Sequence, residues 1–295
     1  MEKEQFDIKK SIDCLCIEID AQQLNPRELA QRVTEVHEST VAASISALYD
    51  ACARHLKTDD PNLYQAGLLI AQKLDADDKS LLHKNAFHNL EHLKIVILSS
   101  LVISKLAEKQ GFNATCLDLL VAAMIHDADH DGATNIVDGK CIPFRLEEKA
   151  MAYAMPIFEE TKVSQLTVGA IHYMLRWTDL AGRTADMKRN YPAGVSDEVE
   201  EKAKMLGDAD LLFALGLGPK KAMNEDRKLN SELNRPFSRA RFLSFINSIA
   251  PNGFFSKGAK FFDPNVKDLV IDLKSIPTKR YTANKAFGLY RPAAP

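Results

Sequence analysis

Apolar residues recur along most of this 295-residue chain at spacings of three and four, which is typical of helices that bury one face. Glycines number only 13, and β-branched runs bounded by turn pairs are few, so little sheet is expected. We therefore predict an all-α fold, a compact multi-helix bundle. The pattern predicts helices at 62–74, 89–109, 114–130, 145–159, 164–177, 197–215, 237–249 and 264–275.

The N-terminal region contains one clear helix start and one ambiguous segment. Asn25 has the side chain of an N-cap and Pro26 fits a first turn, so a helix is predicted from there to about Leu56. Segment 11–20 is compatible with either a helix or a strand. As a strand it would place alternate residues on two faces, with Ile12, Cys14 and Cys16 on one and Leu15, Ile17 and Ile19 on the other.

Length and composition favour one globular unit. A chain of 295 residues with 46% hydrophobic residues can bury a large core. We expect a single helical domain over 1–295, with residues 1–79 as an N-terminal helical part. That part would pack on a core at about 80–275, which holds the motifs described below.

Charge and cysteine usage narrow the expected partners. A net charge of −2 offers no basic surface for a nucleic-acid backbone, which argues against polymeric DNA or RNA as a substrate. No stretch has the length of an apolar membrane span, and the opening residues do not begin a secretory signal. Five cysteines without a Cys-x-x-Cys pair favour reduced thiols. We expect a cytoplasmic protein without membrane partners; export without a cleaved signal and the oligomeric state stay open.

Two short runs hold a high density of metal-binding side chains. Residues 87–92 read Phe-His-Asn-Leu-Glu-His, and residues 123–132 read Ala-Met-Ile-His-Asp-Ala-Asp-His-Asp-Gly. Burying several ionisable groups beside apolar helices is costly unless a metal or partner charges compensate, so we predict a metal site. Histidines within each run stand four residues apart and would share one helical face: His88 with His92, and His126 with His130.

A further ligand is expected from the run 205–212, which reads Met-Leu-Gly-Asp-Ala-Asp-Leu-Leu. Asp208 and Asp210 lie about 200° apart on a helix, so only one of them can face the metal. Asp210 stands in an apolar run where an unpaired carboxylate would be costly. Asp208 follows Gly207 and could instead be a solvated or capping acid. The sequence therefore favours Asp210.

The order His…His-Asp…Asp resembles that of the HD-domain metal-dependent phosphohydrolases. The finer pattern, Phe-His-Asn-x-x-His followed by His-Asp-x-x-His-x-Gly, is similar to the catalytic domain of the class I cyclic nucleotide phosphodiesterases. The likeness continues in order through 132–135, 146–147, 178–179 and 209–211. It implies a phosphodiesterase-like helical bundle. It also implies a role for each matching residue: His88 is the general acid, His92, His126, Asp127 and Asp210 bind the first metal, Asp127 bridges to a second metal held mostly by waters, and His130 and Glu147 position those waters.

Elementary chemistry supports these roles. Two cations about 3.5 to 4 Å apart can share a hydroxide that attacks phosphorus in line. The departing alkoxide needs a proton, which an imidazolium can supply near neutral pH. We expect a metal-dependent phosphohydrolase that cleaves a phosphodiester, a cyclic nucleotide or related small nucleotide, by a metal-bridging hydroxide. A histidine-rich first site suits Zn²⁺, and a water-rich second site suits Mg²⁺ or Mn²⁺.

The expected substrate pocket departs from the phosphodiesterase pattern. Where those enzymes have a purine-binding glutamine, this chain has Arg239 or Phe242, depending on the alignment. Phe242 and Phe245 could form an apolar clamp for a base, or they could be ordinary core residues. The loop 134–143 is expected at the rim of the pocket.

Other readings of the motifs remain open. A nucleotide phosphomonoesterase would use much the same metal centre. A di-iron HD-type oxygenase would need more histidine ligands, and His172 is the only further candidate between His130 and Asp210. A non-catalytic binding protein could keep the metal for structure, although such a site would not need His88.

Overall fold

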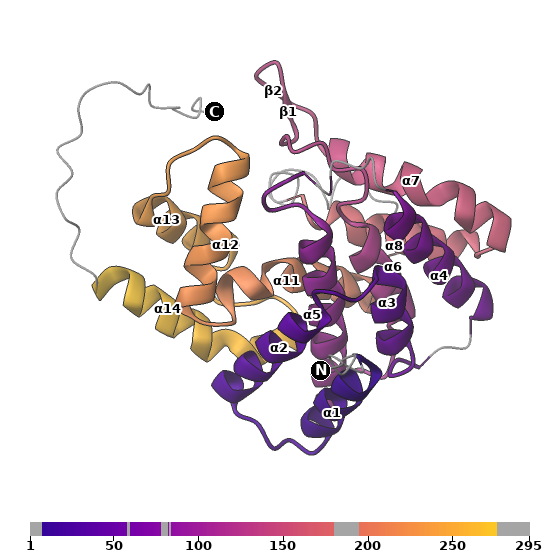
Figure 1. Cartoon of the computed structure of the whole chain (residues 1–295), viewed down its shortest axis with the longest axis horizontal. Coiled ribbons are helices and arrows are strands. Elements are labelled where there is room, and N and C mark those ends of the chain that lie inside the picture. The colour runs from indigo at the N-terminus through magenta and orange to yellow at the C-terminus, as the bar shows by residue number, and fades with distance from the viewer. Residues whose placement is uncertain (1–7, 58–59, 78–81, 83, 180–194, 276–295) are drawn as a thin grey trace, which may run out of the picture.

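The computed structural model describes residues 8–57, 60–77, 82, 84–179 and 195–275. Helices pack in several layers around α5 and α11, which cross in the middle of the molecule (Figure 1). The all-α prediction is confirmed. The elements are α1 (Ile8–Asp20), α2 (Pro26–Thr40), α3 (Ile45–Ala53), α4 (Pro61–Ala76), α5 (Leu90–Lys109), α6 (Leu117–Ile125), β1 (Ile136–Val137), β2 (Lys140–Cys141), α7 (Arg145–Thr161), α8 (Gln165–Arg176), α11 (Asp197–Leu215), α12 (Pro219–Glu232), α13 (Arg239–Ile249), the 3₁₀ helix η2 (Ala259–Phe262) and α14 (Asp263–Ser275).

Two central helices are buried around nearly their whole circumference. All residues of α5 from His92 to Ser104 are buried, and so are all nine residues of α6. A helix that is apolar all round lies in the middle of a fold rather than on its surface. The N-terminal end of α5 and the C-terminal end of α6 carry the histidine runs, so the core fixes where these side chains lie.

The N-terminal helices resolve one open alternative of the sequence-based prediction and correct one helix end. Segment 11–20 is helical, because Ile12, Leu15, Cys16 and Ile19 fall on one buried face of α1. The helix that begins after Asn25 has the expected N-cap, which the structure shows to be a capping box with Glu28, but it ends at Thr40. It therefore does not run on to Leu56.

The break between α2 and α3 has a specific cause. The side chain of Ser44 accepts a hydrogen bond from the backbone N of Ala47 and starts α3. Asp75 of α4 accepts two more, from the backbone N of Ile45 at 2.7 Å and of Ser46 at 3.0 Å. These bonds satisfy the free N–H groups of a new helix start, and Asp75 is too distant in sequence to be anticipated.

Two differences lie nearer the motifs. The helix predicted over 114–130 is shorter at both ends, since α6 spans only Leu117–Ile125. The chain then turns through Asp129, whose φ is 59°. Helix α12 was not predicted, because only Ala222, Glu225 and Asn230 are buried on it and its sequence lacks an apolar stripe.

Helices α1 to α4 pack against α5, α6 and α7, and buried residues from Ile12 to Leu273 form one continuous hydrophobic cluster. The boundary near residue 79 stays a prediction. Helices α12, α13 and α14 gather on the opposite side of α11 (Figure 1). Within the described residues, none of the helices is both long and apolar enough to cross a bilayer.

Candidate metal centre

Three side chains that are distant in the sequence meet at one point: His92 of α5, His126 directly after α6, and Asp210 of α11. The Nε2 atom of His92 lies 3.0 Å from Oδ1 of Asp210 and 3.3 Å from Nε2 of His126. His126 Nε2 lies 3.8 Å from the same Asp210 oxygen. One ligand atom from each residue falls within 4.8 Å of the others, a spacing that could hold one metal ion.

Local structure explains why the two histidines meet. The Asn89 side chain accepts a hydrogen bond from the backbone N of His92 at 3.0 Å and so starts α5 one turn before this ring. His126 follows the last residue of α6, and its Nδ1 lies 2.8 Å from the carbonyl oxygen of Ala123. Because a carbonyl only accepts, Nδ1 carries a proton, and in the neutral ring Nε2 is then the nitrogen with the lone pair that can bind a metal.

Asp127 lies between two groups of possible ligands. Its Oδ2 atom is 3.0 Å from Nε2 of His126 and 3.4 Å from Nε2 of His92. Asp127 also forms a second group with His88 and His130, again within 4.8 Å. The Oδ2 atom is buried and makes no hydrogen bond. Its nearest neighbours are imidazole nitrogens, and a buried set of imidazole nitrogens and carboxylate oxygens fits divalent metals.

The ionisable groups of this centre shift one another's pKa values. Burial lowers the pKa of His126, but the Asp127 carboxylate outweighs it and raises the value to about 9. Burial also raises the pKa of Asp127 and Asp210, and the neighbouring histidines reverse the effect and hold both below their usual range. The pocket therefore favours ionised carboxylates, and a bound cation would compete with a proton for the imidazole nitrogens.

His88 does not lie on a helix, which corrects the expectation that it shares a face of α5 with His92. Asn89 takes the N-cap position, so His88 stands outside the first turn. The two rings are nevertheless near each other, with centroids 5.9 Å apart. The His88 ring stacks on His130 at 3.9 Å with an interplanar angle of 20°.

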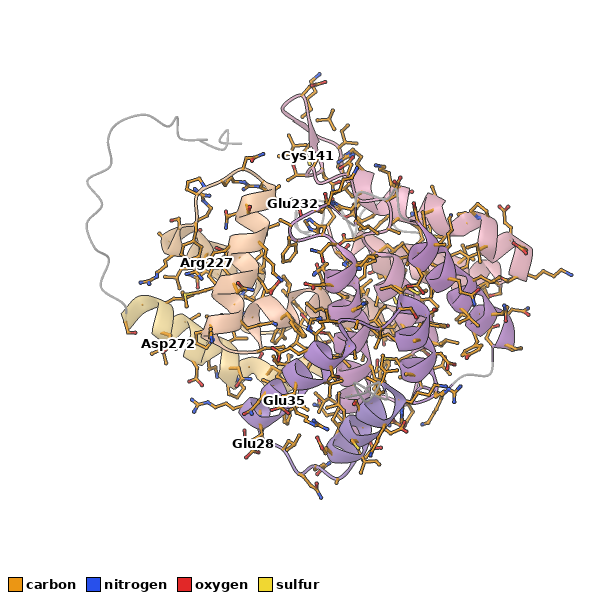
Figure 2. The ribbon with its side chains drawn as sticks, in the orientation of Figure 1. Glu28, Glu35, Cys141, Arg227, Glu232 and Asp272 are labelled. Atoms are coloured by element: carbon orange, nitrogen blue, oxygen red, sulfur yellow. The ribbon has the colours of Figure 1, made fainter. Side chains whose placement is uncertain are left out.

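Glu232, the last residue of α12, holds His88 in place. Its Oε1 atom lies 2.5 Å from Nδ1 of His88, and its Oε2 accepts hydrogen bonds from the backbone N atoms of Phe87 and His88 at 2.8 and 3.0 Å. Figure 2 shows Glu232 where the end of α12 meets the segment before α5. Burial lowers the pKa of His88, whereas Asp127 and Glu232 raise it above the usual range. No sequence pattern indicated Glu232, because it is a charged residue at the end of a polar helix.

His130 also lies outside a helix, contrary to the predicted shared stripe with His126. The backbone N of Gly132 donates to Nδ1 of His130 at 3.0 Å. Because Nδ1 accepts, the ring is neutral, and burial agrees by lowering its pKa to about 4. Gly132 has a φ of 74°, which glycine adopts readily, and this turn brings the ring back toward His88.

Glu147 lies in the first turn of α7 and is buried. Its Oε2 accepts a hydrogen bond from Nδ2 of Asn135 at 3.1 Å. Burial, reinforced by the charge of Asp179, raises the pKa of Glu147 to about 7. The side chain therefore exchanges a proton near neutral pH in the same pocket as the histidines.

Asp208 and Asp210 project from different sides of α11, as their spacing predicted. Asp208 is 1% exposed and accepts hydrogen bonds from the backbone N atoms of Phe255 and Ser256, at 3.0 and 2.6 Å. It is therefore an acid that caps a loop, and it is not solvated. The burial argument for Asp210 was wrong in one respect, because Asp208 is the more buried of the two and finds its partners in the backbone.

The metal-binding groups open into a pocket of about 490 Å³. Phe242 and Phe245 both line it, as do Ile136 and Cys141 of the short β-hairpin that occupies the expected rim loop. Arg239, the other candidate for the glutamine position, is not among the described residues of its wall. Glu147 and Asp179 complete the side near α7.

His172 does not join this centre. Its Nε2 lies 2.9 Å from Oε1 of Glu148, on the exposed side of α7 and α8. Among the described residues, no further histidine therefore belongs to the two candidate metal groups, whereas the oxygenase alternative needs additional histidine ligands.

A comparison with protein-family models finds no matching family, and a comparison with curated proteins finds no match.

Proposed function

We propose that this protein is a metal-dependent phosphohydrolase that cleaves a phosphodiester in a small nucleotide. The observation that carries the proposal is Asp127, a pocket-lining carboxylate that belongs to one His/Asp group and has its buried Oδ2 3.0 Å and 3.4 Å from two histidine nitrogens of the other. The motif resemblance to HD-domain phosphodiesterases supports the same chemistry. Divalent cations bound there would lower the pKa of a water molecule and neutralise charge on the phosphoryl group.

The composition of the pocket supports a metal requirement. Its described wall contains six carboxylates and neither lysine nor arginine: Asp127, Glu147, Asp179, Asp210, Glu225 and Asp226. A phosphodiester anion would be repelled from such a wall unless cations reverse the local charge. His92, His126, Asp127 and Asp210 would hold a first cation, for which the nitrogen-rich set favours Zn²⁺. Asp127 would share a second cation, Mg²⁺ or Mn²⁺, with waters oriented by His130 and Glu147.

His88 would act as the general acid. Glu232 occupies Nδ1, so Nε2 is the nitrogen that is left to protonate the leaving oxygen. The carboxylate also stabilises the imidazolium form, because it raises the pKa of His88. A structural metal site would not need this charged pair beside the ligands.

The test is turnover by the purified full chain, stripped with a chelator and reloaded with Zn²⁺, Mg²⁺ or Mn²⁺. We expect metal-dependent hydrolysis of bis(p-nitrophenyl) phosphate and much slower hydrolysis of p-nitrophenyl phosphate. The matched control is His172→Ala, which removes a histidine outside the centre and should leave both rates unchanged. Turnover of the monoester alone would establish a phosphomonoesterase instead. A metal-loaded protein that hydrolyses neither would disprove the enzymatic proposal.

A further inference from the structure

The pocket continues past the metal groups to a second end, built by α11, α12 and α13. Its described wall there is mostly apolar: Leu211, Ala214, Leu229, Leu233, Phe242 and Phe245. The polar side chains that α12 adds to this wall are Glu225 and Asp226, both carboxylates. A carboxylate anion accepts hydrogen bonds and donates none. This end of the pocket therefore suits a flat apolar group whose edge carries hydrogen-bond donors.

The two carboxylates differ in the ion pairs and hydrogen bonds that they already make. Glu225 is 3% exposed, and its Oε1 lies 3.2 Å from Nζ of Lys228. The Oδ2 atom of Asp226 is buried and makes no hydrogen bond. Burial raises the pKa of Asp226, as expected of a carboxyl that water does not fully solvate. Asp226 is thus the acceptor that a ligand would satisfy.

The nearby arginines are engaged elsewhere. Arg227 lies over the Phe237 ring, 5.2 Å from its centroid. Arg241 donates to the carbonyl oxygen of Pro236 at 3.3 Å and reaches Oδ1 of Asn230 at 3.5 Å. Neither forms an ion pair with Asp226 within 4.0 Å in the described part of the chain. Asn230 and these two arginines still act to lower the pKa of Asp226, so its remaining hydrogen-bonding capacity lies at the buried Oδ2.

The position of Asp226 along α12 matches the reach of a nucleotide. Asp226 precedes Glu232 by six residues, which is roughly 9 Å along a helix that rises about 1.5 Å per residue. Glu232 marks the His88 end, where the phosphate would lie. A ribose and a base span a comparable length from the phosphorus atom.

We propose that Asp226 selects the base of the substrate and that this base is guanine, an inference that rests on the proposed function. Guanine presents N1–H and the 2-amino group side by side, and both can donate to one carboxylate. Adenine places the N1 lone pair beside its amino group, so a carboxylate would face a second acceptor. Phe245, which is partly exposed, offers apolar surface to the base itself, whereas Phe242 lines the same wall but is 2% exposed and belongs to the hydrophobic core.

The test compares 3′,5′-cyclic GMP with 3′,5′-cyclic AMP for the metal-loaded wild type and for Asp226→Asn. Asparagine keeps the size of the side chain but replaces one acceptor by a donor. We expect the wild type to favour the guanine substrate, and we expect Asp226→Asn to lower the guanine-to-adenine ratio of kcat/KM by about tenfold or more. Asp272→Asn, an exposed change on α14, should leave the ratio unchanged. Metal content and melting temperature confirm that each variant is folded.

Failure of this inference is distinguishable from failure of the proposed function. A wild type that hydrolyses bis(p-nitrophenyl) phosphate but shows no guanine preference, or one whose ratio Asp226→Asn does not alter, overturns the assignment of Asp226 alone. If the wild type hydrolyses no phosphodiester, the calorimetric affinities of GMP and AMP for the metal-loaded protein replace the rates. Equal affinities in that case, or a preference that survives Asp226→Asn, overturn the base assignment as well.

Discussion

The Nδ1 atom of His88 lies 2.5 Å from Oε1 of Glu232, although 144 residues separate them in the sequence. The other oxygen of the same carboxylate binds the backbone N atoms of Phe87 and His88. One side chain therefore fixes both the ring and the backbone that carries it.

Removing the Glu232 charge should impair proton donation without emptying the metal site. Glu232→Gln keeps an acceptor for the backbone but no longer stabilises the imidazolium form of His88. We expect hydrolysis of a diester with an alkoxide leaving group to fall about tenfold or more, as general acid catalysis is lost. Bis(p-nitrophenyl) phosphate, whose leaving group needs no proton, should lose much less. Equal losses for both substrates, or a loss of metal, would contradict the role given to His88.

Metal analysis should distinguish the roles of the two aspartates of α11. Asp210→Ala removes an oxygen 3.0 Å from Nε2 of His92, so we expect the purified variant to lose most of its bound metal. Asp208→Ala should keep the metal and instead lose about 2 kcal/mol of unfolding free energy, because two backbone N–H groups lose a charged acceptor. Elemental analysis and urea unfolding measure the two effects. Metal loss from Asp208→Ala alone would reverse the assignment.

His37 should make the fold sensitive to mild acid. The ring is 4% exposed, makes no well-formed hydrogen bond and packs edge-on against Phe213 at 5.0 Å. Burial lowers its pKa to about 4, and the ammonium groups of Lys221, Lys228 and Lys94 act in the same direction. The unfolded chain has the ordinary value of about 6.5, so it binds the proton first.

Because the pKa of His37 is lower in the folded state than in the unfolded chain, acid should destabilise the fold. Stability due to the neutral ring is fully present above about pH 6.5 and is lost as the pH falls toward 4, by up to about 3 kcal/mol. Urea unfolding at pH 7 and pH 5 measures the change. His37→Leu cannot take up the proton, so its stability should depend less on pH over this interval. An identical pH dependence in both proteins would show that other groups cause it.

Two glycines should respond to alanine in opposite ways. A Cβ atom on Gly258 would lie 2.2 Å from the carbonyl oxygen of Ile103, and backbone of a central helix cannot yield as a side chain can. We expect Gly258→Ala to destabilise the protein by at least about 2 kcal/mol. Gly169 of α8 has open space around it, so Gly169→Ala should stabilise by about 0.5 to 1 kcal/mol. Thermal melting of the two variants would contradict this packing if both shifted in the same direction.

The sequence predicted those features that neighbouring residues determine. The apolar period located the buried helices, and the histidine runs indicated His92, His126 and Asp127, which the fold brings together. It failed where distant partners decide the structure. Asp75 of α4 helps to start α3 from 30 residues away and so divides the long helix expected after Asn25. The N-cap at Asn89, which excludes His88 from α5, is by contrast a local feature that the helical spacing of the histidines did not reveal. Glu232 lies on α12, whose face against the rest of the molecule has too few apolar residues to give a period.

The residues of the candidate metal centre are synthesised before the helix that orients His88. His88, His92, Asp127 and Asp210 all leave the ribosome before Glu232, the residue that seats His88. The residues of the candidate metal centre therefore precede in synthesis the carboxylate that orients His88. If the proposed function holds, a chain that stops before α12 lacks the group that stabilises the imidazolium form of its general acid.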